Sequence, residues 1–261
     1  MGSLSRLRLI TFDVTNTLLQ FRSTPGKQYG EIGALFGVLC DKNDLAKNFR
    51  LNWRKMNRAY PNFGRYCKMD WDEWWRQLIQ GTFADSGARI PEGKLDSFSQ
   101  HLVNLYKTSI CWQHCNGSLD LLNYLRMQQQ KTCEPCFVLG IIANFDPRLD
   151  ALLLNMKINH YFDFVLNSYD CRAEKPSREI FDIAIKASNL EDLKCEECLH
   201  IGDGPTTDYL GAKAVGWNAA LVHEKNADYL IDRYGEKIKK NFVFPSLFDF
   251  HKKLSNNEIK W

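Results

Sequence analysis

The sequence contains no long hydrophobic run and no marked excess of charge of either sign. Its longest apolar stretch, 136–143 (CFVLGIIA), is far shorter than the roughly 18 apolar residues that a membrane-spanning helix needs. Lys and Arg total 34 against 31 Asp and Glu, which gives a net charge of +3, and no basic stripe gathers along the chain. We therefore expect a protein that acts neither in a membrane nor on nucleic acid.

We also expect no export signal, and the cysteine content agrees with that. The first residues show no apolar stretch of signal-peptide length before a charged segment begins. The nine cysteines are an odd number for a disulfide framework, and without export they are most simply reduced thiols. The sequence thus predicts an intracellular, cytoplasmic protein, with a nuclear location as the alternative.

The 261 residues are 44% hydrophobic and 25% charged, which is typical of a folded domain rather than a disordered chain. From residue 117 onward, helical patterns alternate with short apolar runs. The helical patterns are 118–129, 147–156, 178–188 and 207–215, and the apolar runs that follow them are 136–143, 162–168, 198–202 and 217–222. This alternation predicts an α/β fold, a doubly wound, Rossmann-like parallel sheet with helices on both faces.

A long helical segment separates the first strand from the others. Residues 7–12 (LRLITF) have the pattern of a strand, whereas about 19 to 112 has the pattern of helices with no convincing strand. We therefore predict an α/β core made of residues 1–18 and 113–261. A helical domain, 19–112, is expected to be inserted after the first strand.

The insert shows two helix starts and one aromatic stripe. Asp41 is placed to cap a helix, and Asp70 with Glu73 three residues later has the spacing of a capping box. The second helix carries an apolar stripe at helical spacing, formed by Trp71, Trp74, Trp75, Leu78 and Ile79. Such a stripe favours the core of a helical bundle, with a surface that faces a substrate as the alternative.

Polar residues stand where the predicted strands end. In chain order they are Asp13, Asn144, the Lys175-Pro176 pair, and Asp203 with Asp208 behind it. An Asp after a strand is often a turn former or a helix cap, so each of these residues alone is weak evidence. Ligands bind at the carboxyl ends of parallel strands, however, and the four pieces together predict a site at that edge of the sheet.

This constellation resembles the motifs of the haloacid dehalogenase-like (HAD) hydrolase superfamily. That superfamily's pattern is Asp-x-Asp-x-Thr, then Ser/Thr-Asn, then Lys-Pro, then Gly-Asp with a second Asp several residues on. The loop 144–146 and the segment 175–181 are similar to one subgroup in particular. The insert resembles the superfamily's helical cap. The resemblance covers nearly the whole chain and implies a HAD-type sheet with that cap after the first strand.

The resemblance also implies phosphoryl transfer with Asp13 as the nucleophile. Two anions repel, so a divalent cation has to lie between the attacking carboxylate and the phosphoryl group. Mg²⁺ prefers oxygen ligands, and the implied ligands are Asp13, the backbone carbonyl of Thr15, Asp203 and Asp208. For Asp208, capping of a helix is the alternative.

Two further residues are expected to act on the phosphoryl group. Lys175 would neutralise its charge and hold the nucleophile, and the side-chain amide of Asn144 would donate to one of its oxygens. The resemblance therefore implies a small phosphorylated molecule as the substrate and Mg²⁺ as the cofactor.

Two positions depart from the superfamily's phosphatase pattern. In that pattern an Asp two residues after the nucleophile acts as the general acid. Thr15 stands at this position, and its hydroxyl is too weak an acid and base for that role near neutral pH. Ala143 stands where a Ser or Thr hydroxyl would contact the phosphoryl group. General acid–base catalysis contributes about 10²–10⁴-fold to the rate. A hydroxyl that donates to the phosphoryl group contributes about 10²–10³-fold.

Three interpretations follow from these departures. The first is a slow phosphatase, best with a leaving group that needs no proton, such as an acyl phosphate; Thr15 stands at the offset of a Thr in the P-type ATPase motif. The second is an inactive module that binds a metal and an anion, with the cap contacting a protein partner. The third is metal-independent carbon–halogen hydrolysis, against which the paired acids Asp203 and Asp208 argue.

Four cysteines form two pairs with zinc-ligand spacing, Cys133-x-x-Cys136 and Cys195-x-x-Cys198. They precede two different strands, and in the HAD strand order the first strand runs between those two, which leaves the pairs about 10 Å apart. We expect reduced, partly buried thiols rather than one zinc site.

Overall fold

The computed structural model describes residues 4–91, 93–131, 137–225 and 227–261, and the chain divides into two compact units. The α/β unit comprises residues 1–20, 114–144 and 157–261, and the helical unit comprises 21–113 and 145–156. The segment 145–156 thus groups with the helices, although the sequence placed it in the core range. None of the described helices is both long and apolar enough to span a membrane.

The α/β unit is built on a six-stranded sheet in which every neighbouring pair is parallel. The strands are β1 (Leu9–Phe12), β4 (Val138–Ala143), β5 (Phe164–Asn167), β6 (Cys198–Gly202), β7 (Asn218–Val222) and β8 (Val243–Phe244). Their order is β5-β4-β1-β6-β7-β8, so β1 lies between β4 and β6. The predicted α/β fold is confirmed; β8, with two residues, was too short to predict.

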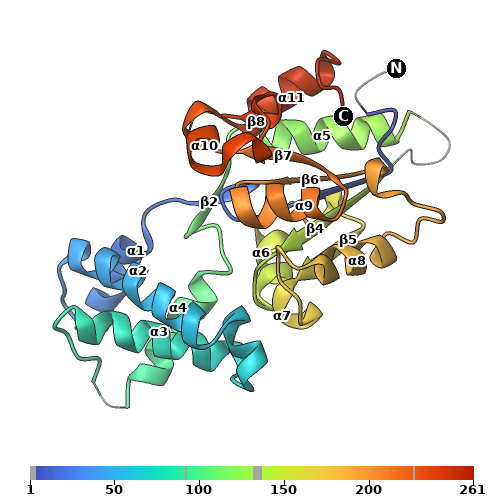
Figure 1. The fold of residues 1–261 in the computed structure, drawn as a ribbon. Helices are drawn as coiled ribbons and strands as arrows, with labels where there is room; N and C mark the ends of the chain where they lie inside the picture. Colours follow the sequence, from blue (N-terminus) through green and yellow to red (C-terminus); the bar gives the residue numbers. More distant parts are fainter. Residues whose placement is uncertain (1–3, 92, 132–136, 226) are drawn as a thin grey trace. The chain divides into compact units, whose positions relative to one another are not determined.

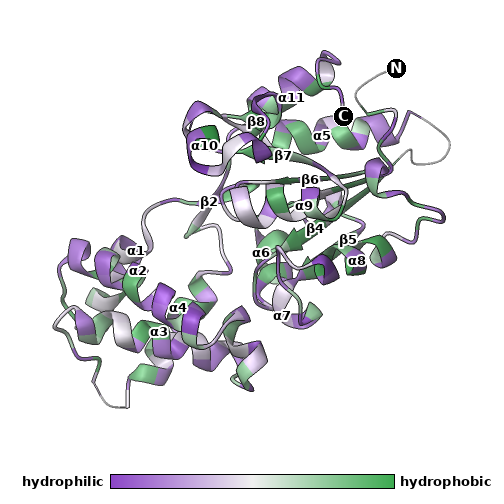
Figure 2. Cartoon of the chain, viewed as in Figure 1, coloured by the Kyte–Doolittle hydropathy of each residue, from purple (hydrophilic) through white to green (hydrophobic). Residues whose placement is uncertain are grey.

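Helices cover both faces of this sheet, with α5 and α11 on one side and α8 and α9 on the other (Figure 1). The helices are α5 (Ser118–Gln129), α7 (Ser168–Cys171), α8 (Arg178–Ala187), α9 (Gly211–Ala214), α10 (Ala227–Tyr234) and α11 (Leu247–Ser255). Shorter turns are Asn159–Tyr161, Cys195–Glu197, the π-helical Pro205–Leu210, Gly235–Lys237 and Lys240–Phe242. Because both faces are covered, the strands are apolar along most of their length, as Figure 2 shows.

The helical unit contains five α-helices among its described residues. They are α1 (Pro25–Leu35), α2 (Lys42–Ala59), α3 (Trp71–Asp85), α4 (Leu95–Leu105) and α6 (Leu149–Asn155), with a 3₁₀ turn at Asn62–Cys67. The chain enters and leaves the first part of the unit through β2 (Leu19–Phe21) and β3 (Trp112–His114), which pair with each other. The expectation of no strand between 19 and 112 is therefore wrong, since three residues are too few to show a period in the sequence.

The two predicted helix starts have different outcomes. Asp41 caps α2, and its side chain accepts from the backbone N–H groups of Asn43 and Asp44. Asp70 stands at the N-cap of α3 but makes no side-chain cap bond, so the predicted capping box is wrong. The carboxylate of Glu73 instead accepts from the side chain of Gln77 one turn further on.

The tryptophan stripe of α3 is partly core and partly a platform for a cation. Trp74 is fully buried among aromatic rings, as expected for a bundle core. Trp71 and Trp75 are half-buried, and the guanidinium of Arg148 lies 4.4 Å from the ring centre of Trp75 and 5.5 Å from that of Trp71. Arg148 is also paired with Asp146, which accepts from the indole N–H of Trp75 at 2.9 Å. A buried ion pair thus joins segment 145–156 to α3 within the helical unit.

Candidate active site

Three carboxylates converge at the carboxyl end of the sheet. Asp13 directly follows β1 and Asp203 directly follows β6, while Asp208 lies in the turn 205–210. One oxygen of each lies within 4.8 Å of the other two. The carboxyl ends of neighbouring parallel strands meet at one edge, so residues 190 positions apart in the chain come together there.

Lys175 reaches into this cluster from the loop before α8. Its Nζ atom lies 2.8 Å from Asp13 Oδ1, 2.6 Å from Asp208 Oδ1 and 2.6 Å from the carbonyl oxygen of Ile142. The lysine is 2% exposed, so its charge is compensated by these oxygens rather than by water. Its position is thereby set by groups from three segments of the α/β unit.

Asn144 holds the backbone of Lys175. Its Nδ2 donates to the carbonyl oxygen of Lys175 at 2.9 Å, and its Oδ1 accepts from the N–H of the same residue at 2.8 Å. This reciprocal pair orients the loop that presents the ammonium group. Donation from Asn144 to a phosphoryl oxygen stays a prediction.

Burial and neighbouring charges shift the pKa values of the three carboxylates. Burial raises the pKa of Asp13 to about 6 against the attraction of Lys175, and the charge of Asp208 adds to the rise. Burial, with Asp13 and Asp208 beside it, raises the pKa of Asp203 to about 8. Burial acts in the same direction on Asp208, but Lys175 and His200 outweigh it and hold the pKa of that carboxyl well below its usual range.

The donor set suits a hard divalent cation. Three carboxylates and one ammonium group leave a formal charge of −2, and every converging ligand atom is an oxygen. Asp203 also accepts from the side-chain amide of Asn16 at 3.3 Å, which orients it within the cluster. These features match what Mg²⁺ requires of a site. The carbonyl of Thr15 as a further ligand stays a prediction.

Glycine at position 202 is required by the close approach of Asp208. A Cβ atom at Gly202 would lie 2.3 Å from Cγ of Asp208, which no side chain could tolerate. Asp208 in turn accepts from the backbone N–H of Gly204 at 2.7 Å, so its second oxygen closes the loop after β6. This acid therefore has a loop-forming role as well as a place in the cluster.

His200 belongs to the same network, although the sequence analysis did not single it out. It lies within β6, fully buried, with Nε2 3.1 Å from Asp208 Oδ1 and 3.3 Å from Lys175 Nζ. Nδ1 lies 2.8 Å from the hydroxyl of Thr11, the residue beside it on β1. Burial, together with Lys175, lowers the pKa of His200 to about 4. The available signal was a histidine within an otherwise apolar strand.

The two departures from the phosphatase pattern stand close to this cluster. Ala143 is the last residue of β4 and is buried, with only a methyl group to offer. Thr15 is two residues beyond Asp13 and forms an isolated bridge with Leu19. Asp13, Lys175 and the other two acids are thus grouped at one edge of the sheet, whereas no carboxylate stands at position 15.

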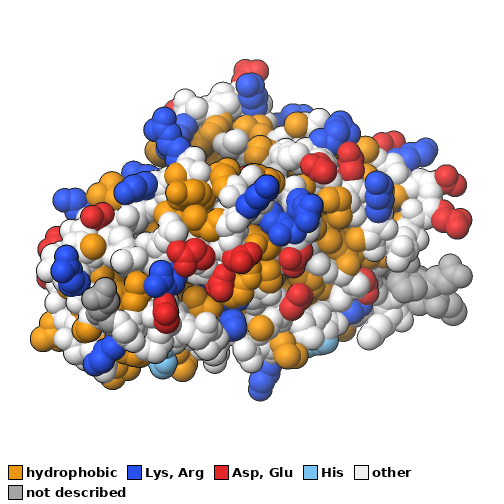
Figure 3. Space-filling model, turned by 90° about the horizontal axis from the view of Figure 1, so that it is seen from below, with side chains coloured by type: hydrophobic (Ala, Val, Ile, Leu, Met, Phe, Trp, Pro, Cys, Tyr) orange, Lys and Arg blue, Asp and Glu red, His pale blue; other side chains and the backbone are white. Residues whose placement is uncertain are grey.

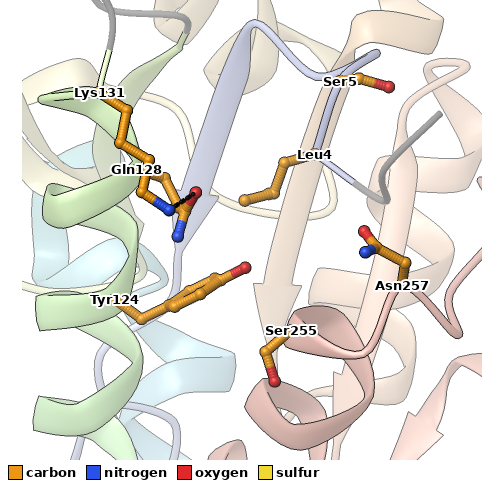
Figure 4. A pocket seen from close by; sticks show the side chains of 7 residues that line it. All are labelled: Leu4, Ser5, Tyr124, Gln128, Lys131, Ser255 and Asn257. Carbon is orange, nitrogen blue, oxygen red and sulfur yellow. Dashed lines mark hydrogen bonds between the residues drawn. The ribbon is translucent and has the colours of Figure 1, made fainter.

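A separate pocket of about 400 Å³ lies elsewhere in the α/β unit (Figure 4). Tyr124, Gln128 and Lys131 line it from α5 and its end, Ser255 from α11, and Leu4 from the segment before β1. Since Leu4 precedes β1, this pocket lies toward the amino ends of the strands, away from the carboxylates. None of its described lining residues is a carboxylate, a histidine or a cysteine.

The cysteine and surface-charge predictions are tested only in part. Cys133 and Cys136 lie outside the described residues, while Cys195 is half-buried and Cys198 buried, both as free thiols. On the face seen in Figure 3, acidic and basic side chains are interspersed. The zinc question and the exclusion of nucleic acid stay predictions.

Comparison with known proteins places these features in context. Residues 7–216 match the model of the haloacid dehalogenase-like hydrolases. The chain is 64% identical to the rhythmically expressed gene 2 protein of Drosophila melanogaster over the full length of both. It is 28% identical to the human haloacid dehalogenase-like hydrolase domain-containing protein 3, over 93% of this chain and 91% of that one.

Solved structures share the fold at low sequence identity. The putative HAD-hydrolase YfnB from Bacillus subtilis, bound to magnesium, has a TM-score of 0.67 and 19% identity, covering 96% of this chain and 99% of its own. The L-2-haloacid dehalogenase from Xanthobacter autotrophicus has a TM-score of 0.64 and 16% identity, covering 95% and 98%. At these identities the likeness establishes the fold and not the reaction.

Proposed function

Because the chain belongs to the haloacid dehalogenase-like hydrolase family, we propose that it is a slow, Mg²⁺-dependent phosphatase that acts through an aspartyl phosphate on Asp13. The observation that carries this proposal is the group of three carboxylates around one buried lysine, with a formal charge of −2. A bound divalent cation would offset that charge and polarise the phosphoryl oxygens. Asp13, Asp203 and Asp208 would hold it.

The chain's own residues supply the remaining steps. A carboxylate oxygen of Asp13 attacks phosphorus while the bond to the leaving oxygen breaks, and Lys175 keeps the nucleophile in place. Water then attacks the aspartyl phosphate, which releases inorganic phosphate and restores the carboxylate. Thr15 assists neither proton transfer, so substrates whose leaving group needs no proton are favoured. Acyl phosphates are such substrates.

The test compares Thr15→Asp with Thr15→Asn, which has the same shape but no acid. On an alkyl phosphate, Thr15→Asp is expected to raise kcat by about 10²–10⁴-fold, because it restores acid–base catalysis. Thr15→Asn is expected to stay near wild type. On acetyl phosphate the gain from Thr15→Asp is smaller, since only the hydrolysis of the intermediate benefits.

Ala143→Ser, added to Thr15→Asp, sharpens the test. The new hydroxyl addresses phosphoryl oxygens rather than the leaving group, so it is expected to help both substrates. If neither variant exceeds wild type while Mg²⁺ still binds, the inactive metal- and anion-binding module replaces the phosphatase. Metal-independent dehalogenation is less well supported, because a metal-free site gains nothing from the paired acids Asp203 and Asp208.

A further inference from the structure

A buried chain of polar groups backs the candidate site from inside the sheet. Thr11 on β1 and His200 on β6 are cross-strand neighbours, and His200 Nδ1 lies 2.8 Å from the Thr11 hydroxyl. On its other side, His200 Nε2 lies 3.1 Å from Asp208 and 3.3 Å from Lys175. All four side chains are at least nine-tenths buried. The imidazole therefore connects Thr11, inside the sheet, to Asp208 and Lys175 beside Asp13.

The geometry points to His200 as a positioning residue that holds the Lys175–Asp208 pair against Asp13, with Thr11 orienting its ring. In one tautomer Nε2–H donates to Asp208, and in the other Nε2 accepts from Lys175; either bond restrains the same pair. The ring of Phe181 packs nearly perpendicular to the imidazole, with ring centres 5.7 Å apart, and limits its rotation. This inference rests on the proposed function and names a residue that the family comparison does not assign.

A neutral ring suits this position better than a charged one. Asp208 and Lys175, which His200 contacts, belong to a cluster whose four charged groups have a formal charge of −2, which matches one divalent cation. A cationic side chain in place of His200 would reduce that charge to −1. A hydrophobic side chain would keep the charge but leave Asp208 without one of its partners. A neutral imidazole leaves the charge of the cluster unchanged and also gives Asp208 a hydrogen-bond partner.

The experiment compares His200→Gln with His200→Leu. The amide of Gln places a donor and an acceptor near the position of Nε2, whereas Leu fills similar space without either. Two quantities are measured: kcat and KM with acetyl phosphate, and the Mg²⁺ dissociation constant by titration calorimetry. Loss of a residue that orients ligands typically costs about 10–100-fold in metal affinity or activity. His200→Leu is expected to lower kcat and weaken Mg²⁺ binding by that factor with KM little changed, and His200→Gln to recover most of both.

Thr11→Val and Thr11→Ser provide a second pair should His200→Leu fail to fold. Thr11→Val removes the hydroxyl at constant shape and is expected to change kcat and Mg²⁺ affinity in the same direction, while Thr11→Ser stays near wild type. Equal losses in His200→Gln and His200→Leu, or wild-type values in His200→Leu, would overturn the inference. If wild-type protein turns over no phosphate ester or acyl phosphate, the phosphatase proposal fails, and the Mg²⁺ titrations still decide the role of His200.

Discussion

Two buried ion pairs, one in each unit, differ in how their charges are balanced. In the helical unit, Arg148 faces one carboxylate, Asp146, at 2.6 Å, and Trp75 donates to the same group. In the α/β unit, Lys175 faces both Asp13 and Asp208. The first pair is neutral within itself, while the second leaves negative charge uncompensated.

This difference is the one we expect between a structural ion pair and the charged cluster of an active site. A balanced, hydrogen-bonded pair needs nothing further, and its aromatic neighbours exclude water around it. An unbalanced cluster of buried carboxylates costs free energy in the folded protein, which a bound cation or a proton relieves. Both groups are buried, so burial alone does not distinguish them, and the sum of their charges is the feature that marks the Lys175 cluster as the candidate active site. The following predictions test this contrast.

The largest expected effect is on turnover. Asp13→Asn removes the proposed nucleophile and, with it, the proposed covalent step, and loss of a nucleophile has cost on the order of 10⁶-fold in kcat where measured. Hydrolysis of acetyl phosphate by purified protein is the measurement. Asp120→Asn, an exposed carboxylate on α5, is the matched control and should keep the wild-type rate. A wild-type rate in Asp13→Asn would remove this residue from the mechanism.

The next effect is on stability. Arg148→Met leaves the buried carboxylate of Asp146 without its cation, and breaking such a pair costs about 3–5 kcal/mol. The double variant Asp146→Asn/Arg148→Met removes both charges and is expected to recover more than half of that loss. Urea unfolding monitored by tryptophan fluorescence gives both values. A double variant as unstable as Arg148→Met would show that lost packing on the Trp75 ring, not the unpaired charge, dominates.

In the cluster around Lys175, the stabilising effect of Mg²⁺ is expected to depend on pH. Folding raises the pKa values of Asp13 and Asp203 from an ordinary 3.8 to about 6 and about 8, so the folded state binds more protons than the unfolded chain. The contribution of these two groups to metal-free stability therefore falls as pH rises from about 4 to about 8. Mg²⁺ needs the deprotonated carboxylates, so its stabilising effect grows over the same range.

The measurement is the melting temperature with and without Mg²⁺ at pH 5.5 and at pH 8. At 100 times its dissociation constant, a ligand adds about 2.7 kcal/mol to stability. A clear rise in melting temperature is expected at pH 8 and a much smaller one at pH 5.5. Arg148→Met should show the same Mg²⁺ shift as wild type, and Asp203→Asn should show almost none. A shift of equal size at both pH values would contradict the assignment of the carboxylates as ligands.

The smallest effect concerns the indole of Trp75. Trp75→Phe keeps an aromatic face near Arg148 but removes the N–H that donates to Asp146. A hydrogen bond to a charged group contributes about 1.5–3 kcal/mol, so a loss at the lower end is expected for this half-buried site. Urea unfolding again measures it, with the Mg²⁺ dissociation constant as the control that should not change.

Much of the fold followed from local patterns. The helix predicted at 118–129 is α5, Ser118–Gln129, and the apolar runs after residue 117 became the strands of the parallel sheet. Strands of only two or three residues were missed, as with β2 and β8, because they are too short to show a repeated pattern. The capping box at Asp70 failed because spacing indicates which residues are able to bond, while the side-chain rotamers decide whether they do.

For the candidate site, the sequence by itself determined which residue types stand at the strand ends. Asp13, Asn144 and Asp203 each follow an apolar run, and the edge of a parallel sheet brings such positions together. The sequence also determined that position 15 lacks a carboxylate and that position 143 lacks a hydroxyl.

Only the tertiary structure decided which partners these residues have. His200 joins the site because β1 and β6 are neighbours in a register that sets it beside Thr11. Asp146 accepts from the indole N–H of Trp75 on α3, which lies 71 positions earlier in the chain. The physical reason is that hydrogen bonds and ion pairs depend on distances of a few ångströms between segments far apart in the chain. Local sequence patterns report burial and periodicity, and they carry no information on such distances.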